Sequence, residues 1–153
     1  MANNIYQIQL EPRDYLRDEA LASAQVLPGM LVERDSNGKF KPHATAGGVA
    51  ERLVAVEDVL QGNGITDAYA SGALVQANYQ RRGNQVYMRL ANGETAVIGS
   101  KLVSNGDGYL KVATADSSAV VVEEDVLAVA IEAVDMSDSS GADPDGFIKV
   151  RII

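Results

Sequence analysis

The sequence predicts an all-β protein: a compact β-barrel or sandwich built from two similar β units, with an N-terminal arm. Valine and alanine dominate the apolar residues, whereas only 5% of the chain is aromatic. Valine favours strands because its branched Cβ is stiff on a pleated surface. The 14 glycines lie mainly between short apolar runs, where the turns of an all-β protein need them. Similar strand-like segments also recur in the same order in both halves of the chain.

Composition excludes several classes of protein. The 153 residues suit one domain that can bury a core without disulfides, and the chain has no cysteine. A net charge of −8 argues against a surface that follows phosphates, so no nucleic-acid partner is expected. No apolar stretch reaches the roughly 18 residues of a membrane helix, and the first residues do not form a signal peptide. No membrane partner is therefore expected.

The N-terminal segment is predicted to be an arm over residues 1–27, ahead of a single β domain over residues 28–153. Apolar and polar residues alternate near its start, which places Tyr6, Ile8 and Leu10 on one face of a strand. Such a strand suits β-augmentation, in which an extended segment pairs with the sheet edge of a partner. The arm is expected to be mobile when free, so its removal should leave the stability of the domain unchanged.

The segment 13–24 that follows is ambiguous. Leu16, Ala20 and Leu21 have approximate helical spacing, and Asp14 is in a suitable position to cap a helix. These features fit a short helix with a narrow, alanine-rich apolar face.

The remaining elements are predicted to be strands joined by tight turns. An Asn-Gly pair at residues 37–38 supplies the positive φ values of a hairpin turn. Turns are also expected at residues 28–29, 62–64 and 81–84. The strand-like runs lie at residues 30–33, 39–41, 52–57, 73–79, 86–90, 102–103, 109–112, 129–132 and 148–152.

An internal repeat relates units of about residues 29–92 and 98–153. Each unit contains a Leu-Val strand, an Asn-Gly turn, a second strand ending in Ala-Thr-Ala, and two later apolar strands. A unit of this size cannot bury its own apolar face well, so the two units are expected to share one core. The alternative is convergence, because a strand, an Asn-Gly turn and a strand form a common combination.

Groups that could support catalysis are few. The single histidine, His43, follows a proline in a polar turn and is interpreted as an exposed loop residue. The acidic stretch 135–146 is the best calcium candidate, but Ile152 stands where an EF-hand loop requires glutamate, so a solvated loop is the simpler interpretation. The acidic run 123–125 is interpreted as a solvated edge. We therefore predict no enzyme activity, no cofactor and no metal.

Two further groups of residues are candidates for binding. Arg81 and Arg82 form the only basic doublet, which in an acidic protein is either a contact for a partner or a charged hairpin tip. Sugar-binding proteins present exposed aromatic side chains, and with no tryptophan that role would rest on Tyr69, Tyr79 and Tyr87.

The order of several short segments carries a resemblance to a known family. These are an apolar lead-in over residues 19–29, Gly-Met-Leu-Val at 29–32, an Asn-Gly turn, Phe-x-Pro-x-Ala at 40–44 and Leu-Val-Ala-Val-Glu at 53–57. The chain resembles the head decoration, or capsid cement, proteins of tailed bacteriophages over most of its length. In the second unit Lys111 stands in the place of Pro42, which departs from the pattern.

The resemblance implies a barrel-like or tulip-like domain that forms homotrimers and binds major capsid proteins on the outer surface of the virion after synthesis in the host cytoplasm. The candidate capsid-binding residues come from the sequence pattern and are Tyr6, Ile8, Leu10, Arg81 and Arg82. The competing hypothesis is a carbohydrate-binding or other β-barrel binding module, or an enzyme.

Overall fold

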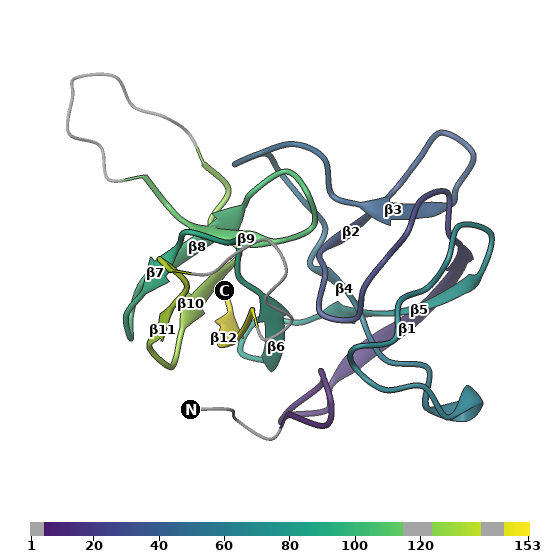
Figure 1. Cartoon of the computed structure of the whole chain (residues 1–153), viewed down its shortest axis with the longest axis horizontal. Helices are drawn as coiled ribbons and strands as arrows, with labels where there is room; N and C mark the ends of the chain where they lie inside the picture. The colour runs from purple at the N-terminus through teal and green to yellow at the C-terminus, as the bar shows by residue number, and fades with distance from the viewer. Residues whose placement is uncertain (1–4, 115–123, 139–145) are drawn as a thin grey trace.

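The computed structural model describes residues 5–114, 124–138 and 146–153. Apart from one 3-10 turn, η1 (Val59–Gln61), every regular element in these residues is a β-strand, which confirms the predicted all-β class. Among them there is no helix with the length and apolar character needed to span a membrane. The strands form two groups that lie side by side in Figure 1, with β1 to β5 in one group and β6 to β12 in the other.

The first group contains an antiparallel sheet in the order β1-β5-β4 and a separate hairpin, β2–β3. Its members are β1 (Tyr15–Leu21), β2 (Val32–Arg34), β3 (Phe40–Pro42), β4 (Leu53–Ala55) and β5 (Leu74–Gln80). The hairpin turn is the one that the Asn-Gly pair predicts, with Gly38 at φ +76°. The Asp35 carboxylate accepts the N–H groups of Lys39 and Asn37, and these hydrogen bonds lower its pKa. Local turn chemistry therefore closes the hairpin.

The second group contains a five-stranded antiparallel sheet in the order β6-β12-β10-β8-β9 and a small pair, β7–β11. Its members are β6 (Gln85–Arg89), β7 (Thr95–Ala96), β8 (Lys101–Ser104), β9 (Leu110–Val112), β10 (Ala128–Ala130), β11 (Val134–Asp135) and β12 (Phe147–Ile152). The two edges of the large sheet meet where Leu90, just after β6, forms a parallel bridge with Leu110. The sheet therefore curls so that its two edges come into contact at this bridge.

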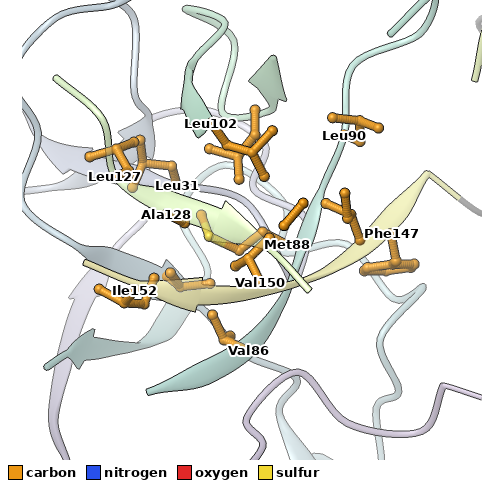
Figure 2. Packing of buried hydrophobic residues seen from close by; sticks show 14 of the residues in the cluster. Leu31, Val86, Met88, Leu90, Leu102, Leu127, Ala128, Phe147, Val150 and Ile152 are labelled. Atoms are coloured by element: carbon orange, nitrogen blue, oxygen red, sulfur yellow. The ribbon is translucent and has the colours of Figure 1, made fainter. Parts of the chain in front are cut away.

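Buried apolar side chains form two clusters. The larger one lies inside the curled sheet, where Val86 and Met88 of β6 lie close to Val150 of the neighbouring β12 (Figure 2). Leu31 and Val54 of the first group also belong to it. The smaller cluster lies within the first group of strands. The two units were predicted to share one core, whereas the buried residues form two clusters. The larger cluster contains residues of both predicted units.

The two hairpins close in the same register. Val32 lies opposite Pro42 in one hairpin, and Val103 lies opposite Lys111 in the other. These are the positions that the internal repeat aligns. A later strand then pairs beside each hairpin, β4 through one bridge and β10 through the ladder with β8. This likeness agrees with the repeat, which stays a prediction.

Residues 1–27 were predicted to form an arm separate from the domain, but residues 5–27 pack and pair with the rest of the chain. The segment around Ile8 does lie along a sheet edge, but that edge is the chain's own β6. Tyr87 N donates to Ile8 O at 2.9 Å, and Leu10 N donates to Gln85 O at 3.1 Å. The Ile8 side chain is completely buried in the larger cluster. The alternating pattern correctly indicated a strand-like segment. This segment pairs with a sheet edge of its own chain, and not with the edge of a partner.

The helix suggested for residues 13–24 is also corrected. Residues 15–21 form β1, which pairs over its full length with β5, and Leu16 lies opposite Tyr79. This strand lies at the edge of its sheet, so its side chains are only partly buried and show no clear alternation of apolar residues. The pairing joins segments about sixty residues apart, which local spacing does not reveal.

Candidate interaction surface

The five predicted capsid-binding residues lie in different environments. Tyr6 is 78% exposed and Arg81 and Arg82 are exposed, whereas Leu10 is half-buried. Ile8 is 0% exposed and therefore cannot contact a partner. The prediction that Tyr6, Ile8 and Leu10 share one accessible face is wrong, because Ile8 is buried in the core.

The structure brings the N-terminal segment and the turn after β5 together. Arg81 Nη1 lies 3.1 Å from Asp14 Oδ2, and Asn84 Nδ2 donates to Asp14 O at 2.9 Å. We call the surface made by Leu10, Asp14, Arg81 and Arg82 the N-terminal surface. Within the described ranges Arg82 forms no ion pair, so its charge remains available on this surface.

Buried amides support the N-terminal surface from behind. Gln9 Oε1 accepts hydrogen bonds from Asn78 Nδ2 at 3.1 Å and from Gln80 Nε2 at 2.6 Å. Asn84 Nδ2 donates to Gln80 Oε1 at 3.1 Å, which extends the network to the turn. Gln9 Nε2 and Asn78 Oδ1 are buried without a hydrogen-bond partner, so the network is only partly satisfied. Its hydrogen bonds still connect the N-terminal segment to β5 and to the turn. Sequence reasoning missed it, although four amide residues near two strand ends were a visible signal.

His43 is buried, so its interpretation as an exposed loop residue is wrong. His43 directly follows β3, and its Nδ1 lies 2.7 Å from Oγ of Ser104 at the end of β8, while its Nε2 lies 3.6 Å from Glu33 Oε2. The three residue types match those of a hydrolase triad. However, His43 is 2% exposed and Ser104 is 0% exposed, so no substrate reaches the hydroxyl group. The arrangement satisfies buried polar groups between the two halves of the chain.

Metal-ligating side chains do not gather in the part of the chain that the structure describes: no three His, Cys, Asp or Glu residues are placed to hold an ion there. Of the acidic stretch 135–146, residues 139–145 lie outside the described residues. Asp135 accepts hydrogen bonds from Ser137 N and Thr95 Oγ1, both at 2.9 Å, and the bonds from Ser137 lower its pKa most. Its carboxylate therefore has a local role in a turn.

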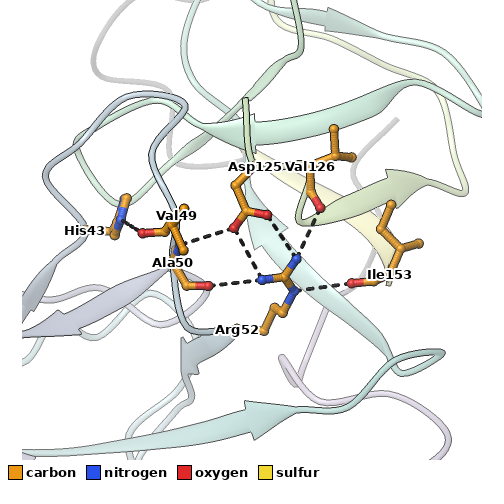
Figure 3. A network of polar contacts seen from close by, with 7 residues as sticks. All are labelled: His43, Val49, Ala50, Arg52, Asp125, Val126 and Ile153. Carbon is orange, nitrogen blue, oxygen red and sulfur yellow. Dashed lines mark hydrogen bonds and ion pairs between the residues drawn. The ribbon is translucent and has the colours of Figure 1, made fainter. Parts of the chain in front are cut away.

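The acidic run 123–125 is not simply a solvated edge, and residue 123 itself lies outside the described residues. Asp125 forms a two-pronged ion pair with Arg52, at 3.2 and 3.3 Å, and Arg52 also donates to Val126 O and Ile153 O (Figure 3). The same carboxylate accepts Ala50 N at 3.2 Å. Bidentate pairs of this kind fix geometry. This network connects the start of β4 with the segment before β10 and with the C-terminus.

The three tyrosines considered for sugar binding do not form a common aromatic surface. Tyr69 is buried, and its hydroxyl donates to Val56 O at 2.6 Å. Burial raises the pKa of Tyr69 to about 12. Tyr79 is 41% exposed on β5, whereas Tyr87 is half-buried on β6. Tyr69 therefore acts in the core and is not available for stacking on a sugar.

Comparison with known proteins gives an informative likeness among solved structures. No family model matches the chain, and no curated protein matches it. Among solved structures, the chain is similar to the crystal structure of the head fiber gp8.5 N base in bacteriophage phi29, with a TM-score of 0.56 and 13% sequence identity. The match covers 91% of this chain and 94% of that chain. At this identity it shows a shared fold, which extends over nearly the whole length of both chains.

Proposed function

We propose that this protein is a structural component of a bacteriophage head: a decoration or cement protein that binds the outer surface of the capsid and stabilises contacts between major capsid proteins. The observation that carries the proposal is the shared fold with a phage head fiber base over 91% of the chain. The buried His43–Ser104 pair agrees with a binding role without catalysis, because the hydroxyl group is out of reach of solvent.

The N-terminal surface is the part of the molecule that we propose for capsid attachment, together with the exposed Tyr6. Arg82 offers positive charge in a chain of net charge −8, and Arg81 beside it is paired with Asp14. The amide network holds the backbone beneath the two arginines, so binding costs little conformational entropy of this backbone. Acidic side chains on a major capsid protein would complement this surface. Ile8 is buried and is therefore not part of the proposed attachment surface.

Reversing the charge of the arginine pair is expected to weaken capsid binding by about a hundredfold, since each reversal replaces an attraction with a repulsion worth at least about 1.4 kcal/mol. The measurement is co-sedimentation of purified chain with heads of its phage from which this protein is absent. The test variant carries Arg81→Glu and Arg82→Glu.

The matched control carries Lys39→Glu and Lys101→Glu, which change the net charge equally at two exposed positions elsewhere. The control is expected to bind like the unchanged protein. Equal binding of both double variants would move the attachment site away from the N-terminal surface. A failure of the unchanged protein to bind any head would overturn the proposed function.

Assembly into a homotrimer is the second part of the proposal. Two apolar pairs lie exposed across β1 and β5: Leu16 with Tyr79, and Leu21 with Leu74. Exposed apolar pairs on neighbouring strands are typical of surfaces that a partner covers. A trimer would also bind several capsid subunits at once, which raises the effective concentration of each weak contact.

We expect light scattering at micromolar concentration to give the mass of three chains. Leu16→Ser combined with Tyr79→Ser, which changes a pair on one face of the sheet, should shift the mass toward one chain, because the contact loses apolar area. Val97→Ser combined with Ile98→Ser is the matched control on an exposed turn of the second group of strands, and it should leave the mass unchanged. A single-chain mass for the unchanged protein would contradict trimer formation.

A further inference from the structure

We propose that a polar pocket beside the β8–β9 turn binds a neutral sugar ring. The pocket has a volume of about 180 Å³ and lies where the chain leaves β6 and passes β9. The side chains that matter for the argument are Arg89, Asn92, Asn105, Asp107 and Tyr109. This inference is independent of the proposed attachment to a capsid, because the pocket and the N-terminal surface share no residue.

Arg89 supplies hydrogen-bond donors from a buried position. It is 6% exposed, its Nε donates to Pro28 O at 2.8 Å, and its guanidinium lies 4.4 Å from the ring centre of Phe147. Another of its nitrogens donates to Ile65 O at 3.2 Å. Within the described ranges no carboxylate forms an ion pair with it. These contacts hold the guanidinium at the pocket and leave part of its five-donor capacity unused.

The β8–β9 turn supplies the acceptors. Asp107 Oδ1 accepts Tyr109 N, and Asp107 Oδ2 accepts Asn105 Nδ2, both at 3.1 Å. The carboxylate is exposed but fixed by these bonds at the wall of the pocket. Tyr109 is half-buried, so its ring adds an apolar wall. The turn thus brings an acceptor-only carboxylate, an amide and an aromatic ring to one place.

This combination determines the class of ligand. A guanidinium only donates and a carboxylate only accepts, so the ligand must offer both acceptors and donors, and neutral sugar hydroxyls offer both in one compact group. An anion would be repelled by Asp107 and by the net charge of −8, and a cation by Arg89. The pocket is smaller than the roughly 300–1,000 Å³ of pockets for drug-sized ligands, which suits one ring.

The test is an NMR titration of the isotopically labelled full chain with glucose, galactose, N-acetylglucosamine and, as an anion, sodium acetate. We expect at least one sugar to shift the amide signals of residues 89–92 and 105–109 in a saturable way, with a dissociation constant of about 1 mM. Acetate is expected to leave these signals unchanged.

Asp107→Asn should weaken sugar binding about tenfold, because a hydrogen bond to a charged group is lost. The matched control is Asp35→Asn: Asp35 accepts backbone N–H groups in the other hairpin turn but lies outside the pocket. It should leave affinity unchanged. If Asp107→Asn does not fold, Tyr109→Phe removes a hydroxyl of the pocket and should weaken binding in the same assay. Absence of saturable shifts with all three sugars, binding of acetate alone at these amides, or equal effects of the test and control variants would overturn the proposal.

Discussion

Replacement of Ile8 by alanine is expected to lower the free energy of unfolding by about 2–5 kcal/mol, the range for large apolar side chains removed from a core. The Ile8 side chain is 0% exposed and packs in the larger cluster of buried residues. Its backbone N–H also donates to Glu57 Oε2 at 3.2 Å, so the surrounding segment is held at both backbone and side chain. Chemical denaturation followed by circular dichroism measures the change.

The matched control for Ile8 is the same substitution at Ile98, whose side chain is 72% exposed. Ile98→Ala should change the free energy of unfolding by no more than about 0.5 kcal/mol. If both variants are equally stable, residues near the N-terminus form a detached arm, as the alternating pattern alone suggests. A large difference shows that the N-terminal segment is part of the folded body.

Gly29→Ala is expected to destabilise the protein by about 2–5 kcal/mol, which combines left-handed backbone strain with overpacking. Gly29 has φ +88°, a conformation that residues with a Cβ atom rarely adopt. An added Cβ would lie 2.9 Å from Phe147 Cε1 and 3.3 Å from Arg89 Cγ. The Arg89 guanidinium itself lies over the Phe147 ring, so neither side chain moves aside easily.

Gly38→Ala separates the two contributions. Gly38 has φ +76° in the β2–β3 turn, and an added Cβ would meet nothing within 4 Å. Only backbone strain remains there, so we expect a loss of about 1–2 kcal/mol. The midpoint of urea denaturation should therefore fall further for Gly29→Ala than for Gly38→Ala. Equal midpoints would show that Phe147 and Arg89 make room for a methyl group without cost.

Turn chemistry and alternation predicted most of the strands. The Asn-Gly pair at residues 37–38 lies in the predicted hairpin turn, and the alternating residues 86–90 overlap most of β6. These features are local, because a glycine with positive φ and a two-residue period act within a few positions of the chain. The same reasoning failed for β1, whose strand character depends on its pairing with β5.

The candidate binding residues were predicted less well than the strands. Tyr6, Arg81 and Arg82 are exposed, as a binding role requires, whereas Ile8 belongs to the core and His43 is buried beside Ser104. Period-two alternation indicates which side chains share a face but does not say which partner covers that face. In this protein β6 of the same chain occupies the edge beside Ile8.

The sequence alone was sufficient to predict the all-β class and the positions of most turns, and it shows that the chain has one histidine and no cysteine. These properties follow from composition and from interactions between near neighbours. The three-dimensional arrangement decided which side chains are inside. It paired β1 with β5, buried Ile8 and His43, joined Arg52 to Asp125, and formed the pocket beside Asp107. Each of these contacts joins segments far apart in the chain, and burial depends on such distant partners.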